Sequence, residues 1–263
     1  MKVCFILERG YPPRRNCVIA ETISLLQERG TRVQVVYPEE EIVRLDTLAV
    51  EADLYLHKSN TELALSLATA LEGLGARVVN SAAASARTKD KVLAAATLHR
   101  AGLPTPRTLA AGEPAQLATK LADGPLMLKP HRGHYGVGLA VIDEAAALPA
   151  RDTYPDLVFA QAYLARARTD LKIFAIGDEV FGVRKPFSTD SFRRVGEPTP
   201  LSPALEEIAR RCGRAFGLEL FGLDIAEGEH GAYVVDVNSF PGYRGVPDAA
   251  RRLAYFVRNA ARV

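Results

Sequence analysis

The first 80 residues alternate short apolar runs with helical segments, and this alternation limits the possible folds more than any other feature of the chain. Strands are expected at residues 2–7 (KVCFIL) and then at RVQVVY, ADLYLH and ARVVN, with helices over 17–29 and about 61–73 between them. Strands that alternate with helices are typical of a parallel sheet. We therefore expect an α/β fold that begins with a parallel lobe.

Basic side chains stand in two of the loops that follow these strands. Arg14 and Arg15 lie in ERGYPPRRN, after the first strand, and His57 and Lys58 end the third. Ligands of parallel sheets gather where strands end and loops begin, so these four residues could hold an anion together. Taken singly, each arginine is explained equally well as a solvated surface residue.

Composition excludes several classes of protein. The 263 residues carry a net charge of +2, which is too small to indicate nucleic acid as a partner. The three cysteines, Cys4, Cys17 and Cys212, show no metal-type spacing and no disulfide framework. No apolar run has the length of a signal region or a membrane span. We expect a cytoplasmic protein without a membrane partner.

Three oxygen ligands lie on two short strands near the C-terminus. Residues 221–226 and 232–237 are apolar runs separated by the turn EGEHG, which predicts a hairpin. Asp236 and Asn238 are two positions apart and share a face, and Asp224 joins them from the neighbouring strand. Carboxylates with an amide oxygen suit Mg²⁺. Taken alone, the pattern also fits polar residues at strand ends that bond to turn amides.

A glycine-rich loop separates two strands in the middle of the chain. One strand ends in Lys129-Pro130, and Gly133, Gly136 and Gly138 follow before AVI resumes a strand. Glycines let backbone amides turn toward a phosphate, and lysine adds a compact charge. This is neither a P-loop nor a dinucleotide fingerprint, because no GK[ST] pair or helix follows. We interpret the loop as a lid over a triphosphate; a plain glycine hairpin is the alternative.

From Asn80 to the C-terminus, the order of motifs resembles the ATP-grasp superfamily in its RimK-like branch, the glutamate-ligase type. NSAAASARTKDKVLAAATLHRAGLPTP looks like the stretch in which Asn-Ser is followed by Asp-Lys, a helix and a Gly-Leu-Pro-x-Pro turn; here the helix is expected to begin near Thr88 after a loop. The glycine lid, Asp170-x-Lys172, Asp224 and Asp236-x-Asn238 follow in family order. Three positions depart from the family: Ala162 replaces a glutamate, Lys172 an arginine and Asp236 a glutamate.

The resemblance implies an α/β ATP-grasp fold of three lobes, with the nucleotide between the last two. The expected boundaries are 1–85 for the parallel lobe, 86–165 for the central lobe with the lid, and 166–263 for the lobe with the metals. It also implies ATP and Mg²⁺ as cofactors. The residues implied to bind the nucleotide are Lys91, Lys129, Gly133, His134, Tyr135, Gly136, Gly138, Gln161, Ala162, Tyr163, Leu164 and Asp170.

The resemblance implies roles for the remaining site residues as well. Asp224, Asp236 and Asn238 would hold the metal, and Lys172 and Arg184 would stabilise charge on the transferring group. The residues expected to contact an anionic acceptor are Arg14, Arg15, His57, Lys58, Lys185, Arg193 and Arg244.

The acceptor divides the family. RimK-like ligases phosphorylate a carboxylate and let an amine displace phosphate, whereas inositol tris/tetrakisphosphate kinases of the same fold phosphorylate a hydroxyl. GYPPRR, DLYLHKSN and DVNSFPGYRGVP are similar to the kinases, while NSAAASARTKDK and the short lid look like the ligases. We predict a carboxylate-amine ligase acting through an acyl phosphate, with a kinase as the alternative and a regulator without turnover as a weaker third. The partner is a small anionic acceptor, an amino acid being one candidate; a homo-oligomer stays open.

Overall fold

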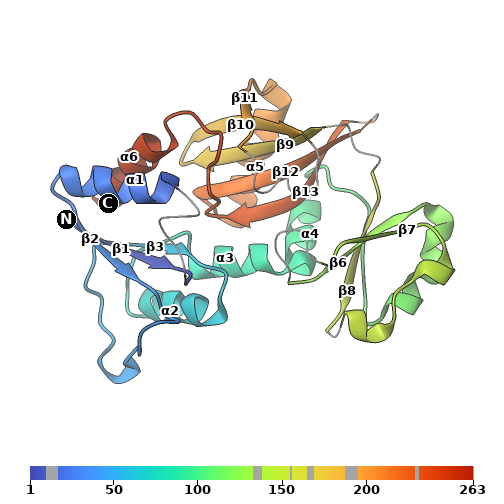
Figure 1. Cartoon of the computed structure of the whole chain (residues 1–263), viewed down its shortest axis with the longest axis horizontal. Helices are drawn as coiled ribbons and strands as arrows, with labels where there is room; N and C mark the ends of the chain where they lie inside the picture. The colour runs from blue at the N-terminus through green and yellow to red at the C-terminus, as the bar shows by residue number, and fades with distance from the viewer. Residues whose placement is uncertain are drawn as a thin grey trace.

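A computed structural model describes residues 1–9, 17–132, 138–154, 156–164, 169–186, 195–228 and 231–262, whose strands form three separate sheets (Figure 1). The first is parallel, in the order β2-β1-β3-β4, from β1 (Lys2–Leu7), β2 (Arg32–Val36), β3 (Leu54–Lys58) and β4 (Val78–Val79). The predicted parallel sheet is therefore confirmed, and it places the end of β3 beside the end of β1.

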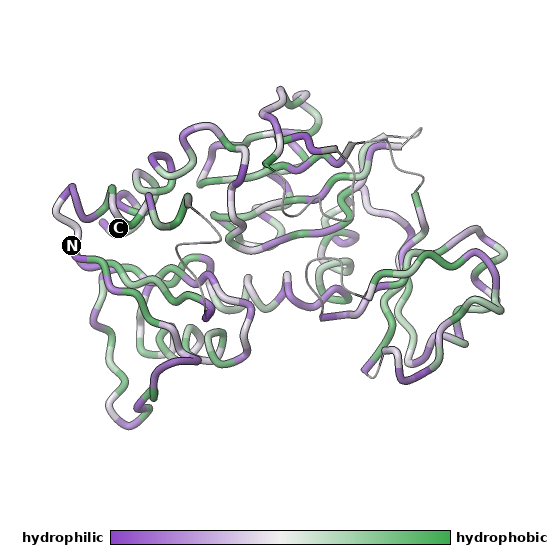
Figure 2. The backbone as a smooth tube through the Cα atoms, in the orientation of Figure 1, coloured by the Kyte–Doolittle hydropathy of each residue, from purple (hydrophilic) through white to green (hydrophobic). Residues whose placement is uncertain are grey.

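Alternation along β1 sorts its side chains onto two faces of this sheet. Val3, Phe5 and Leu7 pack in one core with α1 (Cys17–Glu28). Cys4 and Ile6 pack in another core, with α2 (Glu62–Gly73). Because successive residues of a strand point to opposite faces, one apolar run serves both cores. Apolar stretches accordingly follow the strands in Figure 2.

The central sheet is antiparallel and has the order β5-β8-β6-β7. Its strands are β5 (Thr108–Ala111), β6 (Leu126–Pro130), β7 (Ala140–Ile142) and β8 (Val158–Ala162), with 3₁₀ turns at Pro114–Asp123, Ala145–Ala147 and Arg151–Thr153. A small core of its own includes Leu117, Leu126, Leu128 and Tyr154. This lobe stands apart on the right of Figure 1.

The third sheet is antiparallel, in the order β11-β10-β9-β12-β13. Its strands are β9 (Thr169–Ile176), β10 (Glu179–Pro186), β11 (Glu197–Thr199), β12 (Leu220–Gly228) and β13 (Gly231–Ser239). Helix α5 (Pro203–Phe216) covers one face; Ser202 caps its start by accepting a hydrogen bond from the Leu205 amide, and Gly217 ends it at φ +70°. The opposite face is left for the site and the other lobes.

One expectation for the segment between the first two lobes is wrong. A loop was expected from Asn80 to about Thr88, but α3 (Ala82–Lys89) and α4 (Lys91–Arg100) occupy it. Ser81 accepts a hydrogen bond from the Ala84 amide at the start of α3, and Asp90 ends α3 and caps α4. Four of the eight residues of α3 are alanine, the best helix former, so local propensity supports this helix. Its small side chains also let it pack closely against β13 and α2.

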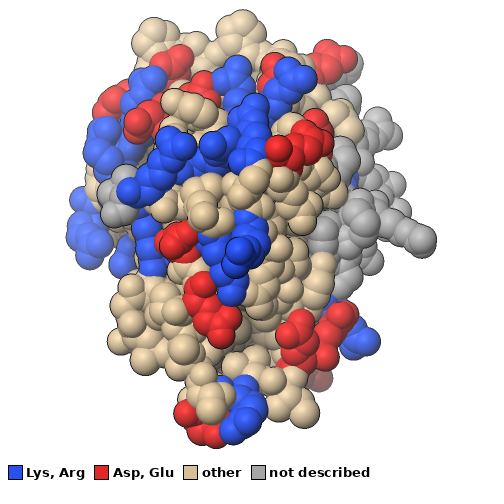
Figure 3. All heavy atoms as spheres, turned by 90° about the vertical axis from the view of Figure 1, so that its left-hand side faces the viewer, with Lys and Arg blue, Asp and Glu red and all other residues tan. Residues whose placement is uncertain are grey.

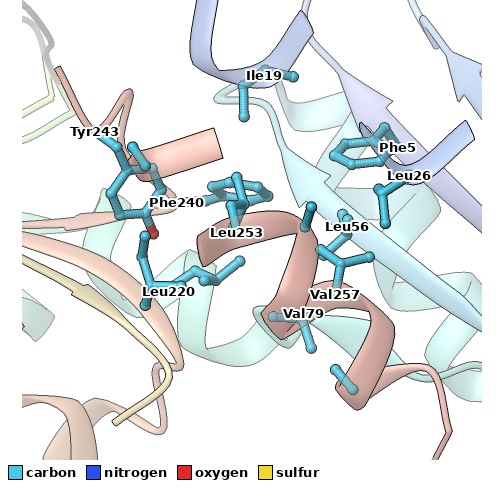
Figure 4. Packing of buried hydrophobic residues seen from close by; sticks show 14 of the residues in the cluster. Phe5, Ile19, Leu26, Leu56, Val79, Leu220, Phe240, Tyr243, Leu253 and Val257 are labelled. Atoms are coloured by element: carbon cyan, nitrogen blue, oxygen red, sulfur yellow. The ribbon is translucent and has the colours of Figure 1, made fainter. Parts of the chain in front are cut away.

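The last helix returns to the first lobe. Helix α6 (Ala249–Ala260) packs beside α1, and the shared core contains Ile19, Leu253 and Val257 (Figure 4). The same core reaches the third sheet through Phe240 and Tyr243, whose hydroxyl donates to the Ala175 carbonyl at 3.0 Å. The first and third lobes therefore share one apolar core. The boundary expected between the central and third lobes, at 165/166, stays a prediction.

Basic side chains gather on the end of the molecule formed by α1 and α6 (Figure 3). Arg251 and Arg262 are exposed there.

In the part of the chain that the structure describes, no helix has the length and apolar character needed to cross a bilayer.

Replacing Leu253 by alanine should lower the free energy of unfolding by about 2–5 kcal/mol, because the side chain is fully buried between α6 and α1 and its loss leaves a cavity. Tyr255→Ala on the same helix is the matched control, since Tyr255 is 66% exposed and its change should stay within about 0.5 kcal/mol. Urea unfolding of both variants measures the difference; equal midpoints would contradict the shared core.

Candidate active site

Two carboxylates face each other at the centre of the candidate site. The register of β12 and β13 pairs Asp224 with Asp236, and Asn238 stands two positions further along β13, opposite Gly222. On the other side of β12, Lys172 of β9 is paired with Asp224. Lys172, Asp224 and Asp236 therefore form a row across three strands on one face of the sheet, with Asn238 beside it.

The electrostatics of this row call for a cation. Burial and the Asp224 charge raise the pKa of Asp236, even though Lys91, Lys129 and Lys172 oppose the shift. Burial acts to lower the pKa of Lys172, but the charge of Asp224 and the hydrogen bond that Lys172 donates to it outweigh burial, so the pKa is raised. Two opposed, half-buried carboxylates with an amide oxygen nearby form a donor set that fits Mg²⁺.

Within the described residues, no group of three or more His, Cys, Asp or Glu side chains could hold a metal ion. The candidate set therefore rests on two carboxylates and one amide, which leaves coordination positions for water and phosphate oxygens. Such an incomplete shell is typical of Mg²⁺ sites that also bind a nucleotide.

A bulge in β13 connects this row to the central lobe. Ile225 pairs with Val234 and Asp224 with Asp236, so Val235 has no partner in the β12 register. Lys129, at the end of β6, donates to the Val235 carbonyl at 3.3 Å and to Gln161 Oε1 at 2.6 Å. The bulge thus brings a buried lysine of one lobe next to the carboxylates of another.

Lys91 approaches the carboxylates from the start of α4. Asp90 accepts hydrogen bonds from the amides of Val92 and Leu93 at 2.9 and 3.1 Å, which sets the first turn of the helix. The Lys91 amide donates to the His131 carbonyl at 3.2 Å, tying α4 to the loop after β6. The charges of Lys91 and Lys129 both oppose the rise in the pKa of Asp236, so the two predicted phosphate-binding lysines lie near the predicted metal ligands.

The segment expected to seat adenine lines a small pocket beside Lys129. Gln161, Ala162, Tyr163 and Leu164 form it together with Pro106, Met127, Lys129, Ala226 and Val235. The pocket has a cavity volume of about 20 Å³. The pocket lies at the junction of the two lobes, where the sequence predicts the nucleotide.

The register does not bring Arg184 to the site face. Arg184 is paired with Leu171, whose side chain faces the α5 core, and its guanidinium pairs with Glu227 at 2.5 and 3.2 Å. Lys185 is paired with Asp170, on the face that carries Lys172. The prediction that Arg184 acts with Lys172 on the transferring group does not fit this register, because a strand alternates and only one of two adjacent cations can point to a given face.

Lys185 takes the position expected of Arg184. It is 4% exposed, and burial, with the nearby charges of Lys172 and Arg244, lowers its pKa. The charges of Asp224 and Asp170 act in the opposite direction. The structure therefore gathers Lys172, Lys185, Arg244 and Asp170 around the carboxylate row.

His57 and Lys58 lie at the end of β3, in a separate pocket of about 60 Å³. Ser239 of β13 also lines this pocket, so it borders the third sheet. His57 is 2% exposed, and burial followed by the charge of Lys89 lowers its pKa to about 4. Lys58 donates to the carbonyls of Phe240 and Pro241 at 2.5 and 3.1 Å. Burial lowers its pKa to about 7, although the Glu8 carboxylate opposes the shift.

The structure describes only one of the three glycines predicted for the lid, Gly138. Its φ is +75°, and a Cβ at this position would stand 2.7 Å from Pro130 Cγ, so only glycine fits there. Predicted residues outside the described part of the chain are Arg14, Arg15, Gly133, His134, Tyr135, Gly136 and Arg193.

No role was predicted for the side chain of Asn80, which holds the third sheet against α3. Its amide oxygen accepts from the amides of Glu219 and Leu220 at 2.9 and 3.0 Å, and its nitrogen donates to the Leu220 carbonyl and to Ser239 Oγ at 2.6 and 2.9 Å. These bonds fix the start of β12 and the end of β13, the two strands that carry the candidate metal ligands. The buried Asn next to Ser81 was visible in the sequence only as part of the family motif.

Comparison with known proteins gives one family match and many relatives. Residues 88–253, more than half of the chain, match the RimK-like ATP-grasp domain. A probable alpha-L-glutamate ligase of Thioalkalivibrio sulfidiphilus is 30% identical over 211 residues, covering 73% of this chain and 70% of that protein. One from Shewanella amazonensis is 25% identical over 276 residues, covering 91% and 90%. A probable alpha-L-glutamate ligase of Shewanella frigidimarina is 29% identical over 196 residues, covering 69% of this chain and 66% of that protein.

Solved structures agree in fold. A RimK domain ATP-grasp protein from Sphaerobacter thermophilus has a TM-score of 0.72 at 19% identity, covering 98% of this chain and 100% of that one. The D-cycloserine synthetase DcsG has a TM-score of 0.73 at 14% identity, covering 98% and 99%. The ATP-grasp ligase PsnB, in complex with a precursor variant, Mg and ADP, has a TM-score of 0.71 at 19% identity, covering 98% and 98%. These likenesses confirm the ATP-grasp fold.

The buried His57 should make stability depend on pH. Its pKa lies at about 4 in the folded chain against 6.5 ordinarily, so the unfolded chain binds more protons between those values and stability falls as pH drops through that window. The loss at pH 4 relative to pH 7 should be about 3 kcal/mol larger in the native chain than in His57→Gln. Unfolding by urea across this pH range measures it.

The matched control for this measurement is His99→Gln. His99 is exposed on α4, so this variant should lose as much stability toward pH 4 as the native chain. A His57→Gln curve parallel to the native one would show that His57 is not held neutral by burial.

Proposed function

We propose, given that this chain belongs to the RimK-like ATP-grasp family, that it is a MgATP-dependent carboxylate-amine ligase acting through an acyl phosphate. The observation that carries the proposal is the meeting of charges from two lobes: the row of Lys172, Asp224 and Asp236 on the third sheet faces Lys129 of the central lobe across the Val235 bulge. The family uses ATP and Mg²⁺, and these residues fit both.

Each group in the row has a role in the proposal. Asp224, Asp236 and Asn238 hold Mg²⁺, which when bound neutralises charge on the β and γ phosphates. Lys91 and Lys129 bind phosphate oxygens, and residues 161–164, at the end of β8, seat adenine. Lys172 and Lys185 stabilise the charge on the phosphoryl group in transfer, the role first expected of Lys172 and Arg184. Asp170 orients Lys185, to which it is paired across β9 and β10.

The proposed chemistry has two steps. A carboxylate oxygen of the acceptor forms a bond to the γ phosphorus while the bond to the ADP oxygen breaks. The lone pair of an amine then forms a C–N bond at the acyl carbon, the C–O bond to phosphate breaks with its electrons on phosphate, and the proton of the amine passes to solvent. Both steps need a site that holds reactants in line and screened by cations.

A hydroxyl kinase is the second candidate. The observation that favours it is local: Asp236 stands where the ligases usually carry glutamate, and the loop after β13 reads SFPGYRGVP. The first step would be the same transfer, with a hydroxyl oxygen in place of the carboxylate. Names of the relatives, probable alpha-L-glutamate ligases, support the ligase over the kinase.

Asp236→Ala and Asn238→Ala should each lower Mg²⁺-dependent ATP turnover at least about 100-fold while leaving the chain folded, because each removes an oxygen ligand from an already sparse metal shell. Release of ADP at saturating Mg²⁺ measures turnover. Asp178→Ala is the matched control: this carboxylate is exposed in the turn between β9 and β10, and its loss should change nothing. Near-native turnover in both site variants would refute the metal assignment.

Products separate the two candidate reactions. The chain is incubated with MgATP and a pool of amino acids, other carboxylates and inositol phosphates, and small molecules are analysed by mass spectrometry. We expect an acceptor that gains an amine by amide formation, with release of ADP and phosphate. An acceptor that gains only a phosphoryl group would establish the kinase instead.

A further inference from the structure

The loop after β13, residues 240–246 (FPGYRGV), has an uncommon backbone. Phe240 and Tyr243 have φ angles of +42° and +52°. A positive φ crowds the Cβ of any residue other than glycine, so each of these conformations costs free energy and persists only where surrounding contacts enforce it. Residues held in this way cluster at functional sites. The contacts that hold this loop therefore bear on the candidate site.

Lys58 of the first lobe supplies one of these contacts. Its ammonium donates to the carbonyls of Phe240 and Pro241 at 2.5 and 3.1 Å, and it lies 5.0 Å from the centre of the Phe240 ring. Hydrogen bonds from an ionised donor are about twice as strong as neutral ones. Because the two acceptors belong to consecutive residues, Lys58 fixes the direction of the backbone where it leaves β13.

Arg244 lies between two residues of this loop that are themselves held. Tyr243 is fully buried, and its hydroxyl donates to the Ala175 carbonyl at 3.0 Å (Figure 4). Gly245 has φ +89°, and a Cβ there would stand 2.6 Å from the carbonyl oxygen of Gly196, so the backbone lies close against its neighbour. With both flanking residues held, Arg244 can leave the loop in few directions.

The charge of Arg244 reaches the candidate active site. It helps to lower the pKa of Lys185, which is buried and shares a face with Lys172. Arg244 itself is half-buried. Its position depends on the preceding residues of the loop, which Lys58 holds from another lobe.

The sequence predicts that Lys58 contacts the acceptor directly, and its bonds in the structure give it a different role. An ammonium has three N–H donors and no acceptor, and two of these donors go to carbonyls of the chain itself. A lysine used in this way orders the backbone rather than a substrate.

We propose that Lys58 is a positioning residue, which holds the loop after β13 and thereby directs Arg244 toward the carboxylate row. The proposal rests on the ligase function above. It gives the first lobe a part in the reaction, because a cation at the end of β3 sets where a cation of the third lobe stands, without contacting the reacting atoms.

Hydrogen exchange of the full chain, without nucleotide or acceptor, tests whether Lys58 holds the loop. The amides of Phe240 and Val246 report on the loop, because both donate to backbone carbonyls, at 2.8 and 3.1 Å. Lys58→Met, which keeps the length of the side chain and loses its charge, should raise their exchange rates at least about tenfold. Unchanged rates would overturn the proposal.

Two controls separate a released loop from a destabilised chain. Lys89 lines the same pocket as Lys58 but pairs with Glu62 at 3.0 Å, so Lys89→Met should leave the exchange of both amides at the native rate. In Lys58→Met, the amides of α2 should also keep their native rates. An equal rise over the whole chain would show lost stability instead of a released loop, and would overturn the proposal.

A double-mutant cycle tests whether Lys58 acts through Arg244. ADP release is measured with MgATP and the mixed pool of the product survey, diluted until release is proportional to its concentration. Lys58→Met and Arg244→Gln should each lower the rate about tenfold, and the double variant should lose no more than about tenfold. A loss of about a hundredfold in the double variant would show that the two act independently, as a direct contact of Lys58 with the acceptor would, and would overturn the proposal.

Lys58→Ala with ethylammonium gives a second measurement that does not depend on the methionine variant. The ion has the chemistry of the end of the lysine side chain, and the pocket beside Lys58 gives it room. Ethylammonium should restore slow exchange at Phe240 and Val246, while ethanol, which is of similar size and uncharged, should not. Equal effects of the two compounds, or no restoration, would count against a loop held by charge and would overturn the proposal.

Failure of this proposal differs from failure of the ligase. If the product survey shows amide formation while Lys58→Met exchanges like the native chain, the ligase stands and Lys58 does not position Arg244. If the exchange and the cycle respond as expected but only phosphorylated alcohols form, the role of Lys58 stands and the ligase reaction does not.

Discussion

The structure depends on the close approach of two carboxylates, Asp224 and Asp236, across neighbouring strands. Like charges directly opposite each other in a sheet destabilise it, and burial makes the repulsion stronger. The fold compensates with cations from three places: Lys172 on the next strand, Lys129 from the central lobe and Lys91 at the start of α4. The same compensation draws the central lobe onto the third sheet, so the feature that suits Mg²⁺ also sets where the lobes meet.

The two faces of the third sheet differ in polarity and in what they contact. The face toward α5 is apolar, and the charged residue Arg184 on it forms an ion pair with Glu227. The other face begins as the apolar core shared with α1 and α6, around Phe240 and Tyr243, and turns polar toward Asp224. An apolar joint beside a charged row holds the first and third lobes together, and the loop after β13 passes from one to the other.

Much of the site was predictable because it depends on short-range periodicity. Alternation placed Asp236 and Asn238 on one face, and the order of strand, glycine loop and strand identified Lys129 and Gly138 without knowledge of contacts. Arg184 and Lys185 show the limit of such reasoning. Adjacent residues necessarily point to opposite faces of the sheet. The register with β9 decides which of the two side chains points toward the site, and that register depends on packing against α5.

From the sequence alone came most strands and helices and the residue types of the carboxylate row, because helix and strand periods and turn residues act over a few positions. The order of the lobes was implied by the family resemblance. Only the tertiary structure decided that the Val235 carbonyl leaves the ladder to meet Lys129, and that Glu8, His57, Ser85 and Ser239 line one pocket. These features join residues many positions apart, and their pairing follows from the packing of whole lobes, which no local pattern encodes.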